Sequence, residues 1–268
     1  IEKYFSAKAK LFSEQYSLKA VVNRDDVHGK LLLDTISIKA DSFGLSDIKH
    51  VSCDARRHGY EIDGTKISVN IGGQFNVMNS LAAVNAARAL GVSLHVIARG
   101  LANASAVDGR FEAINAGQDF EVIVDYAHTP DALIRVLEST RSLMTMNSQL
   151  IVVFGCGGDR DTDKRAKMGE IAAMLADVVV ITSDNPRSES SADIAKQINA
   201  GVRDLDSHKV LCTELDRRAA IGKALSIAKT GDVVVIAGKG HENTQTIGTH
   251  VFPFSDALVA RELLGALS

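Results

Sequence analysis

FEVIVDYA, at residues 120–127, begins the series of short β-branched runs that decides the fold. From here on, such runs alternate with amphipathic segments of roughly 10 to 15 residues, a pattern typical of βαβ units around a parallel sheet. Several runs are apolar throughout, as strands buried on both faces require. We therefore expect an α/β fold with a Rossmann-like, mostly parallel six-stranded sheet. The strand-like runs are 120–127, LIVVFGC (150–156), DVVVITS (177–183), HKVLCT (208–213), DVVVIAG (232–238) and a weaker TQTIGTHVFPF (244–254), and the helical segments are 130–143, 163–175, 191–202, 215–229 and 255–267.

The sequence before this series has a different texture. Helical spacing of apolar residues predicts a helix over 75–92 and a second over 93–103. Asp108-Gly109 then breaks the helical pattern, and a new strand begins. We therefore expect two closely packed domains, 1–108 and 109–268. The strand-like runs of the first block are LKAVVN (18–23), TISIKA (35–40), IKHVSCDA (48–55) and HGYEIDGTKISVNI (58–71), the last with a hairpin turn at Asp63-Gly64.

Composition excludes several classes of protein. The chain is 46% hydrophobic and 24% charged, which is ordinary globular composition. Its formal net charge of −3, without a basic tract, gives no footprint for nucleic acid. Three widely spaced cysteines disfavour a disulfide or zinc framework and indicate reduced thiols in the cytoplasm. No apolar run approaches the roughly 20 residues that cross a bilayer, and the first residues have no signal-peptide pattern.

Polar residues follow the strand-like runs, where open parallel sheets bind their ligands. The turn at 155–158 is rich in glycine, and Arg160 beyond it can bind a carboxylate or a phosphate. The alternative is a plain turn with solvated charges. Asp184 and Arg187 flank a proline, so that the pair suits a zwitterion, with Arg187 facing its carboxylate and Asp184 its ammonium. The alternative there is a surface turn with a salt bridge.

Other candidates are ambiguous from spacing alone. Residues 238–242, GKGHE, look like the lysine turn of a phosphate loop, but GxxxxGK[ST] occurs nowhere in the chain. His128 suits a base, a hinge ligand or a structural role. Asn76 and Asn79 lie at the start of the helix near residue 75, where Asn76 either caps the helix or presents its amide to a purine. Lys8 lies on an amphipathic segment, where most lysines are simply solvated.

Taken together, the motifs resemble those of the Mur ligases of peptidoglycan synthesis. Eight stretches match in the family's order across the whole chain, which makes coincidence negligible. They are YFSAKAKLF (4–12), NRDD (23–26), FNVMNSLAA (75–83), DGRFE (108–112), DYAHTPDAL (125–133), GCGGDRDTDKR (155–165), DNPR (184–187) and GKGHE (238–242).

The resemblance implies an ATP-dependent amide ligase that uses magnesium. In this family ATP phosphorylates the D-glutamyl carboxylate of UDP-N-acetylmuramoyl-L-alanyl-D-glutamate, and the amine of an amino acid attacks the acyl phosphate. By position, Lys8 matches the lysine that is carbamylated and helps to hold magnesium, a reaction that calls for a partly buried amine with a lowered pKa. Asn76 and Asn79 match the adenine side. Arg110 and Asp125 match the strip that meets the nucleotide, with His128 close by as a catalytic candidate.

The same resemblance places an amino-acid pocket in the second domain. An arginine after the proline goes with meso-diaminopimelate, whereas family members that add lysine lack this cation. Arg187 therefore indicates meso-diaminopimelate as the amino acid. The matching residues are Arg160, Asp184, Asn185, Pro186, Arg187, Gly238 and Glu242.

The chain departs from the family at its front. It has neither the domain for the uridine nucleotide nor the phosphate loop, so that residues 1–108 match only the later part of the central ATPase domain. We expect a monomeric fragment that does not ligate alone but keeps the diaminopimelate pocket within 110–268. Two alternatives stay open: a non-catalytic amino-acid-binding module, or a related amide ligase similar to cyanophycin synthetase, which shares the GRF and DYAH-type stretches.

Overall fold

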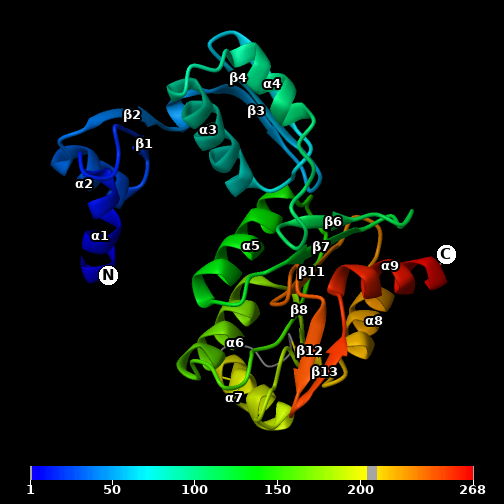
Figure 1. Cartoon of the computed structure of the whole chain (residues 1–268). Coiled ribbons are helices and arrows are strands. Elements are labelled where there is room, and N and C mark those ends of the chain that lie inside the picture. The colour runs from blue at the N-terminus through cyan, green and yellow to red at the C-terminus, as the bar shows by residue number, and fades with distance from the viewer. Residues whose placement is uncertain (1, 204–209, 268) are drawn as a thin grey trace. The chain divides into compact units, whose positions relative to one another are not determined.

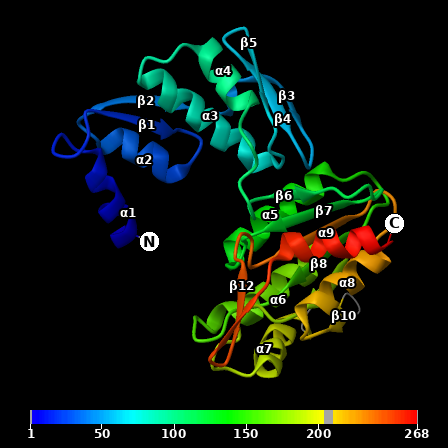
Figure 2. The ribbon, with the colours of Figure 1, turned by 45° about the vertical axis from the view of Figure 1, so that its right-hand side comes forward.

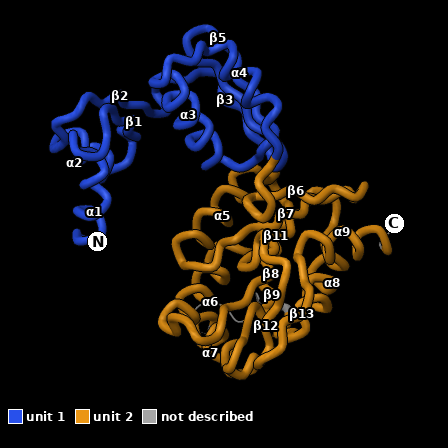
Figure 3. Tube along the Cα trace, in the orientation of Figure 1, with its two compact units in different colours: residues 1–105 blue, residues 106–268 orange. Residues whose placement is uncertain are grey.

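The computed structural model describes residues 2–203 and 210–267, and the chain forms two compact units. Figure 3 shows unit 1, residues 1–105, in blue and unit 2, residues 106–268, in orange. The division falls three residues before the boundary expected from Asp108-Gly109. No helix in the described ranges is long and apolar enough to cross a membrane.

Unit 1 contains two small sheets (Figure 1). The strands β1 and β2 pair in parallel, and β3, β4 and β5 form an antiparallel sheet. Val77, Leu81 and Val84 of α3 are fully buried and form part of a core with residues of β4 and β5. The elements are α1 (Glu2–Ala9), a 3-10 turn η1 (Lys10–Phe12), β1 (Lys19–Asn23), α2 (Val27–Thr35), β2 (Lys39–Phe43), η2 (Leu45–Asp47), β3 (Lys49–Cys53), β4 (His58–Ile62), β5 (Thr65–Val69), α3 (Gln74–Ala89) and α4 (Leu94–Ala102).

Local signals explain most of unit 1. Asp63 and Gly64 have φ angles of 46° and 73°, which confirms the predicted hairpin turn between β4 and β5. The prediction of a strand over 35–40 was wrong in its position, because the helix α2 continues through residue 35. Asp26 starts this helix, since its carboxylate accepts hydrogen bonds from the His28 and Gly29 amides.

Unit 2 is a three-layer α/β sandwich around the sheet β10-β9-β8-β11-β7-β6. All neighbouring strands are parallel except β6, which runs antiparallel to β7. The helices α5, α6 and α7 pack together on one face, and α8 and α9 pack together on the other (Figure 2). The elements are β6 (Glu112–Ile114), β7 (Glu121–Asp125), α5 (Pro130–Leu143), β8 (Leu150–Phe154), α6 (Asp163–Leu175), β9 (Val178–Ile181), α7 (Ser191–Arg203), β10 (Val210–Thr213), α8 (Arg217–Ile227), β11 (Val233–Ala237), β12 (Thr244–Ile247), β13 (His250–Pro253) and α9 (Asp256–Leu267).

One predicted strand of this sheet was wrong. The run 244–254 forms the antiparallel hairpin β12–β13, which lies outside the main sheet. Gly248 turns the hairpin at a φ of 59°, and Val251 and Phe252 are exposed, unlike residues of a strand covered on both faces. The sixth strand is instead β6, at the point where a new strand was expected to begin. Residues 208 and 209 of the predicted fourth run lie outside the described residues.

Candidate functional site

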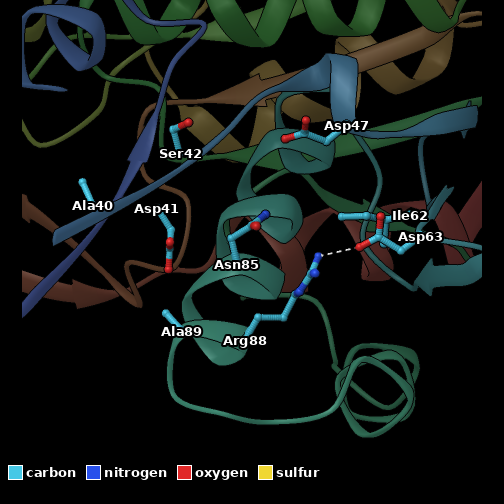
Figure 4. Close-up of a pocket in the computed structure, with 9 residues that line it drawn as sticks. All are labelled: Ala40, Asp41, Ser42, Asp47, Ile62, Asp63, Asn85, Arg88 and Ala89. Atoms are coloured by element: carbon cyan, nitrogen blue, oxygen red, sulfur yellow. Dashed lines mark ion pairs between the residues drawn. The ribbon is translucent and has the colours of Figure 1, made fainter. Parts of the chain in front are cut away.

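A cavity of about 590 Å³ lies in unit 1 (Figure 4). Its charged side chains are partly paired, since Arg88 lies 2.9 Å from Asp63. None of the site residues expected from the sequence lines this cavity. The lining residues are Ala40, Asp41, Ser42, Asp47, Ile62, Asp63, Asn85, Arg88 and Ala89.

Asn76 and Asn79 lie in the first turns of α3. The Asn76 amide donates to the Gly72 carbonyl at 2.7 Å, and the Asn79 amide donates to the Asn76 side-chain oxygen at 2.9 Å. The residue that precedes the helix is Gly73, so the interpretation of Asn76 as its cap was wrong. Contact of either amide with a purine stays a prediction.

Lys8 is exposed on α1, a helix without buried residues. Its ammonium lies 5.4 Å from the centre of the Tyr4 ring. The expectation of partial burial was therefore wrong, because α1 turns Phe5 and Ala9, and not Lys8, toward the small core of β1 and α2. In the described part of the chain, no three side chains of His, Cys, Asp or Glu come together to hold a metal ion.

A cavity of about 370 Å³ in unit 2 collects most of the residues expected to bind the amino acid. Of the seven residues predicted for the amino-acid pocket, all but Pro186 line this cavity. His128 lines it as well. They follow β7, β8, β9 and β11, whose carboxyl ends meet at one edge of the sheet. The lining residues are Tyr126, His128, Thr129, Gly157, Arg160, Asp161, Lys164, Asp184, Asn185, Arg187, Gly238 and Glu242.

The loops after β8 and β9 interlock. The Gly158 amide donates to the Asn185 carbonyl at 2.8 Å, and the Arg187 guanidinium donates to the Gly158 carbonyl at 2.7 Å. A Cβ at residue 158 would lie 1.9 Å from the Pro186 carbonyl oxygen, so only glycine allows this approach. The glycines at 157 and 158 are therefore packed against the loop after β9, whereas Arg160 and Asp161 beyond them are exposed, so the alternative of solvated charges stays open.

Arg187 is held by its backbone as well as by its side chain. Its φ of 51° lies in the left-handed region, which arginine rarely adopts. The hairpin β12–β13 stabilises this conformation, since the Arg187 amide donates to the Thr246 carbonyl at 3.1 Å and its carbonyl accepts from Gly248 at 2.7 Å. No salt bridge joins Arg187 to Asp184, so the alternative of a surface ion pair at this turn was wrong; the described cation beside Asp184 is Lys239.

Lys239 is a residue of the site that sequence reasoning missed. Its side chain is fully buried, and its ammonium contacts Asp184, Asn185 and Glu242. The only signal in the sequence was its place between two glycines, three residues before Glu242. Burial alone would raise the pKa of Glu242, but the hydrogen bonds from Lys239 and Asn185 outweigh it, so that the pKa lies below its usual range.

The cavity is electrostatically balanced. Among its described lining residues, three are cations (Arg160, Lys164 and Arg187) and three are anions (Asp161, Asp184 and Glu242). The loops after β8 and β9 each carry groups of both signs, which together are complementary to a ligand with charges of both signs.

The residues expected near the nucleotide lie beside this cavity. The Arg110 guanidinium stacks on the Tyr126 ring at 4.7 Å, and the His128 ring lies 4.5 Å from the same ring. His128 donates from Nδ1 to the Tyr126 carbonyl at 2.9 Å, so its neutral form presents Nε2 as an acceptor. Asp125 is buried, and its carboxylate accepts from the Phe111 and Ala127 amides. Burial raises the Asp125 pKa despite these two bonds.

This fold and these loops define a Mur ligase, and the chain belongs to that family. Residues 1–87 match the Mur ligase middle domain, and residues 109–240 match the Mur ligase glutamate ligase domain.

Relatives named UDP-N-acetylmuramoyl-L-alanyl-D-glutamate–2,6-diaminopimelate ligase occur in Gloeobacter violaceus, at 46% identity over 98% of this chain, and in Syntrophomonas wolfei, at 41% over 98%. A solved structure of a ligase with the same name is 35% identical over 99% of this chain, with a TM-score of 0.65. A folylpolyglutamate synthase from Mycobacterium tuberculosis shares the fold, at 19% identity over 98% of this chain and a TM-score of 0.68. The chain covers only 55%, 56%, 57% and 59% of these four proteins.

Proposed function

We propose that the unit 2 cavity binds meso-diaminopimelate, and that the chain is part of an ATP-dependent ligase that adds this amino acid to UDP-N-acetylmuramoyl-L-alanyl-D-glutamate through an acyl phosphate. The observation that carries the proposal is that the Arg187 guanidinium, fixed on the Gly158 carbonyl, lines one cavity together with the carboxylates Asp184 and Glu242. Diaminopimelate has a carboxylate and an ammonium at each end, which match the cations and anions that line this cavity.

The names of the relatives support this choice of substrate. The ligases from Gloeobacter violaceus and Syntrophomonas wolfei carry 2,6-diaminopimelate in their names. Arg187 follows Pro186, the position where the family resemblance associates arginine with diaminopimelate. Arg160, Asn185 and Gly238 complete the proposed pocket, in which Gly238 leaves space for the ligand and Asn185 orients Glu242 at 2.8 Å.

The role toward ATP is a separate part of the proposal. Arg110 stacked on Tyr126 in unit 2 would offer a guanidinium to a phosphate. Independently, Asn76 and Asn79 of unit 1 would contact adenine through their amides. His128 would act as an acceptor at Nε2. Bound ATP supplies the activating phosphoryl group. Magnesium has no assigned ligands in this proposal, since no three His, Cys, Asp or Glu side chains come together among the described residues.

We propose that residues 1–108 are the later part of an ATP-binding domain and that residues 109–268 are the amino-acid-binding ligase domain of a cytoplasmic, monomeric enzyme. The separate matches to 1–87 and 109–240 and the two compact units support this division.

Calorimetric titration of the 268-residue chain with meso-diaminopimelate tests the proposal. We expect saturable binding that weakens by about tenfold or more in Arg187→Asn, because a charge-assisted hydrogen bond contributes roughly 1.5–3 kcal/mol. Asparagine tolerates the left-handed backbone of residue 187, so this variant removes the charge without adding strain. Arg218→Asn, an exposed arginine on α8, is the control and should bind as the unchanged chain does. Equal affinity in Arg187→Asn would refute the proposed role.

A further inference from the structure

We propose that Lys239 is a positioning residue of this cavity, which holds Asp184 and Glu242 in place so that their outward oxygens receive an ammonium group of the amino acid. This inference rests on the proposed function and extends it to a residue that does not contact the ligand. Lys239 is absent from the cavity lining and is fully buried beneath it.

Each of the three ammonium protons of Lys239 has an acceptor in the protein. Its Nζ lies 3.0 Å from Oε2 of Glu242, 3.1 Å from Oδ1 of Asn185 and 3.4 Å from Oδ1 of Asp184. An ammonium has three donors, so these contacts use all of them. Lys239 is therefore saturated by the protein and has no donor left for a substrate or a phosphate.

The same contacts leave one oxygen of each carboxylate available. Among the described residues, no hydrogen bond reaches Oδ2 of Asp184 or Oε1 of Glu242. Gly238 lines the cavity beside them, and a Cβ at this position would lie 3.7 Å from Oδ2 of Asp184. The missing side chain at residue 238 leaves that oxygen accessible to a ligand.

Charge explains why a lysine is needed here. Asp184 and Glu242 converge on one buried ammonium, and without it their two negative charges would repel each other at close range. With Lys239 in place, the three groups carry one net negative charge beside the cavity, which matches one ammonium of the ligand. The nearby Arg217 cannot replace Lys239, because its guanidinium is paired with Asp256.

Lys239→Gln removes the charge but keeps a polar side chain, so it distinguishes an electrostatic positioning role of Lys239 from a packing role. In Lys239→Gln we expect meso-diaminopimelate binding to weaken by about tenfold. We also expect the acid limb of the binding profile to move up by roughly one to three pH units, because Glu242 loses the cation in direct contact with it and keeps only the charge of Arg187, which makes no ion pair with it. In a Glu242→Gln background, Lys239→Gln should add little further loss, since the lysine acts partly through that carboxylate. Lys223→Gln, which breaks an exposed lysine–glutamate pair with Glu214, is the control for both measurements.

Carbon-13 NMR titration of the Glu242 carboxyl in the ligand-free chain provides a readout independent of the substrate. A raised Glu242 pKa in Lys239→Gln would support the inference, and an unchanged titration would overturn it. If the unchanged chain does not bind diaminopimelate, the proposed function fails, while this titration still tests the effect of Lys239 on Glu242. If binding and its pH profile are the same in Lys239→Gln and the unchanged chain, the inference fails alone. Lys239→Met provides the same neutral test should the glutamine variant not fold.

Discussion

Arg217, the first residue of α8, ties together the strand ends that carry the site. Its guanidinium donates to the carbonyls of Ser183 at 3.1 Å and Ala237 at 3.0 Å, the residues before Asp184 and Gly238. It also binds both carboxylate oxygens of Asp256 at 2.7 Å, and both side chains of this pair are fully buried. Arg217→Met removes these bonds and leaves Asp256 buried without its cation.

We expect Arg217→Met to lower the free energy of unfolding of unit 2 by about 3–5 kcal/mol, the usual cost of breaking a buried ion pair on one side. Arg218 is the matched control, because it is adjacent and also pairs with an acid, Glu262, but at the surface. Arg218→Met should lower that free energy by no more than about 1 kcal/mol. Hydrogen exchange of the β8 amides under native conditions measures both losses, since these residues are fully buried in the central sheet.

A double variant tests the electrostatic origin of this loss. Arg217→Met with Asp256→Leu removes both charges, and we expect it to recover part of the stability, because an apolar replacement of a buried pair is often neutral or better. Equal losses in Arg217→Met and Arg218→Met would refute the reasoning. A double variant as unstable as the sum of its two single variants would refute it as well.

Three further predictions concern the walls of unit 2. Gly158→Ala should lower the free energy of unfolding by roughly 1–3 kcal/mol in chemical denaturation, because the new Cβ would lie 1.9 Å from the Pro186 oxygen. Burial raises the pKa of Cys156 to about 12, so we expect mass spectrometry to show no alkylation of this thiol in the folded chain at pH 8. The hydrogen bond from Arg165 lowers the pKa of Glu189 from 4.5 to about 2, so its stabilisation is present above pH 4.5 and is lost toward pH 2. In Glu189→Gln, the free energy of unfolding should therefore fall less steeply between pH 4.5 and pH 2 than in the unchanged chain.

Each of these predictions has a control within the chain. Gly100→Ala on α4 meets no atom within 4 Å and should leave stability unchanged or raise it by up to about 1 kcal/mol. Cys53 is only partly buried and should be alkylated before Cys156. Glu170→Gln, at an exposed acid of α6, should leave the acid limb as it is. An unchanged free energy of unfolding in Gly158→Ala would contradict the first prediction, and alkylation of Cys156 before Cys53 would contradict the second. The third would be contradicted if stability fell equally toward low pH in Glu189→Gln and in the unchanged chain.

The sequence predicts the central strands of unit 2 because burial on both faces requires continuous apolar residues. All five residues of β8 are fully buried, for example, and its run was recognised on that basis. The run 244–254 was misassigned because its apolar residues are similar in type but lie exposed on a hairpin. A run of apolar residues does not by itself indicate whether one face of the strand is exposed to solvent. The short strand β6 was indicated only by the break in the helical pattern at Asp108-Gly109.

The candidate site was predictable where strand topology alone brings residues together. Arg160, Arg187 and Gly238 follow three different parallel strands and meet in one cavity for that reason. The part played by Lys239 was not predictable, because its burial depends on Asp184 and Asn185, more than 50 residues earlier in the chain. For Lys8 the amphipathic pattern predicted a helix, which is present, but the face of that helix that packs on a core carries Phe5 and Ala9, and Lys8 is exposed.

The central claim is that the unit 2 cavity recognises an amino acid with charged groups at both ends. Calorimetric comparison of meso-diaminopimelate with L-lysine on the unchanged chain tests this claim most directly, since lysine lacks the second carboxylate. We expect diaminopimelate to bind at least about tenfold more tightly, because only it provides a carboxylate for Arg187 at its far end. Equal affinities for the two amino acids, or no measurable binding of diaminopimelate, would contradict the account.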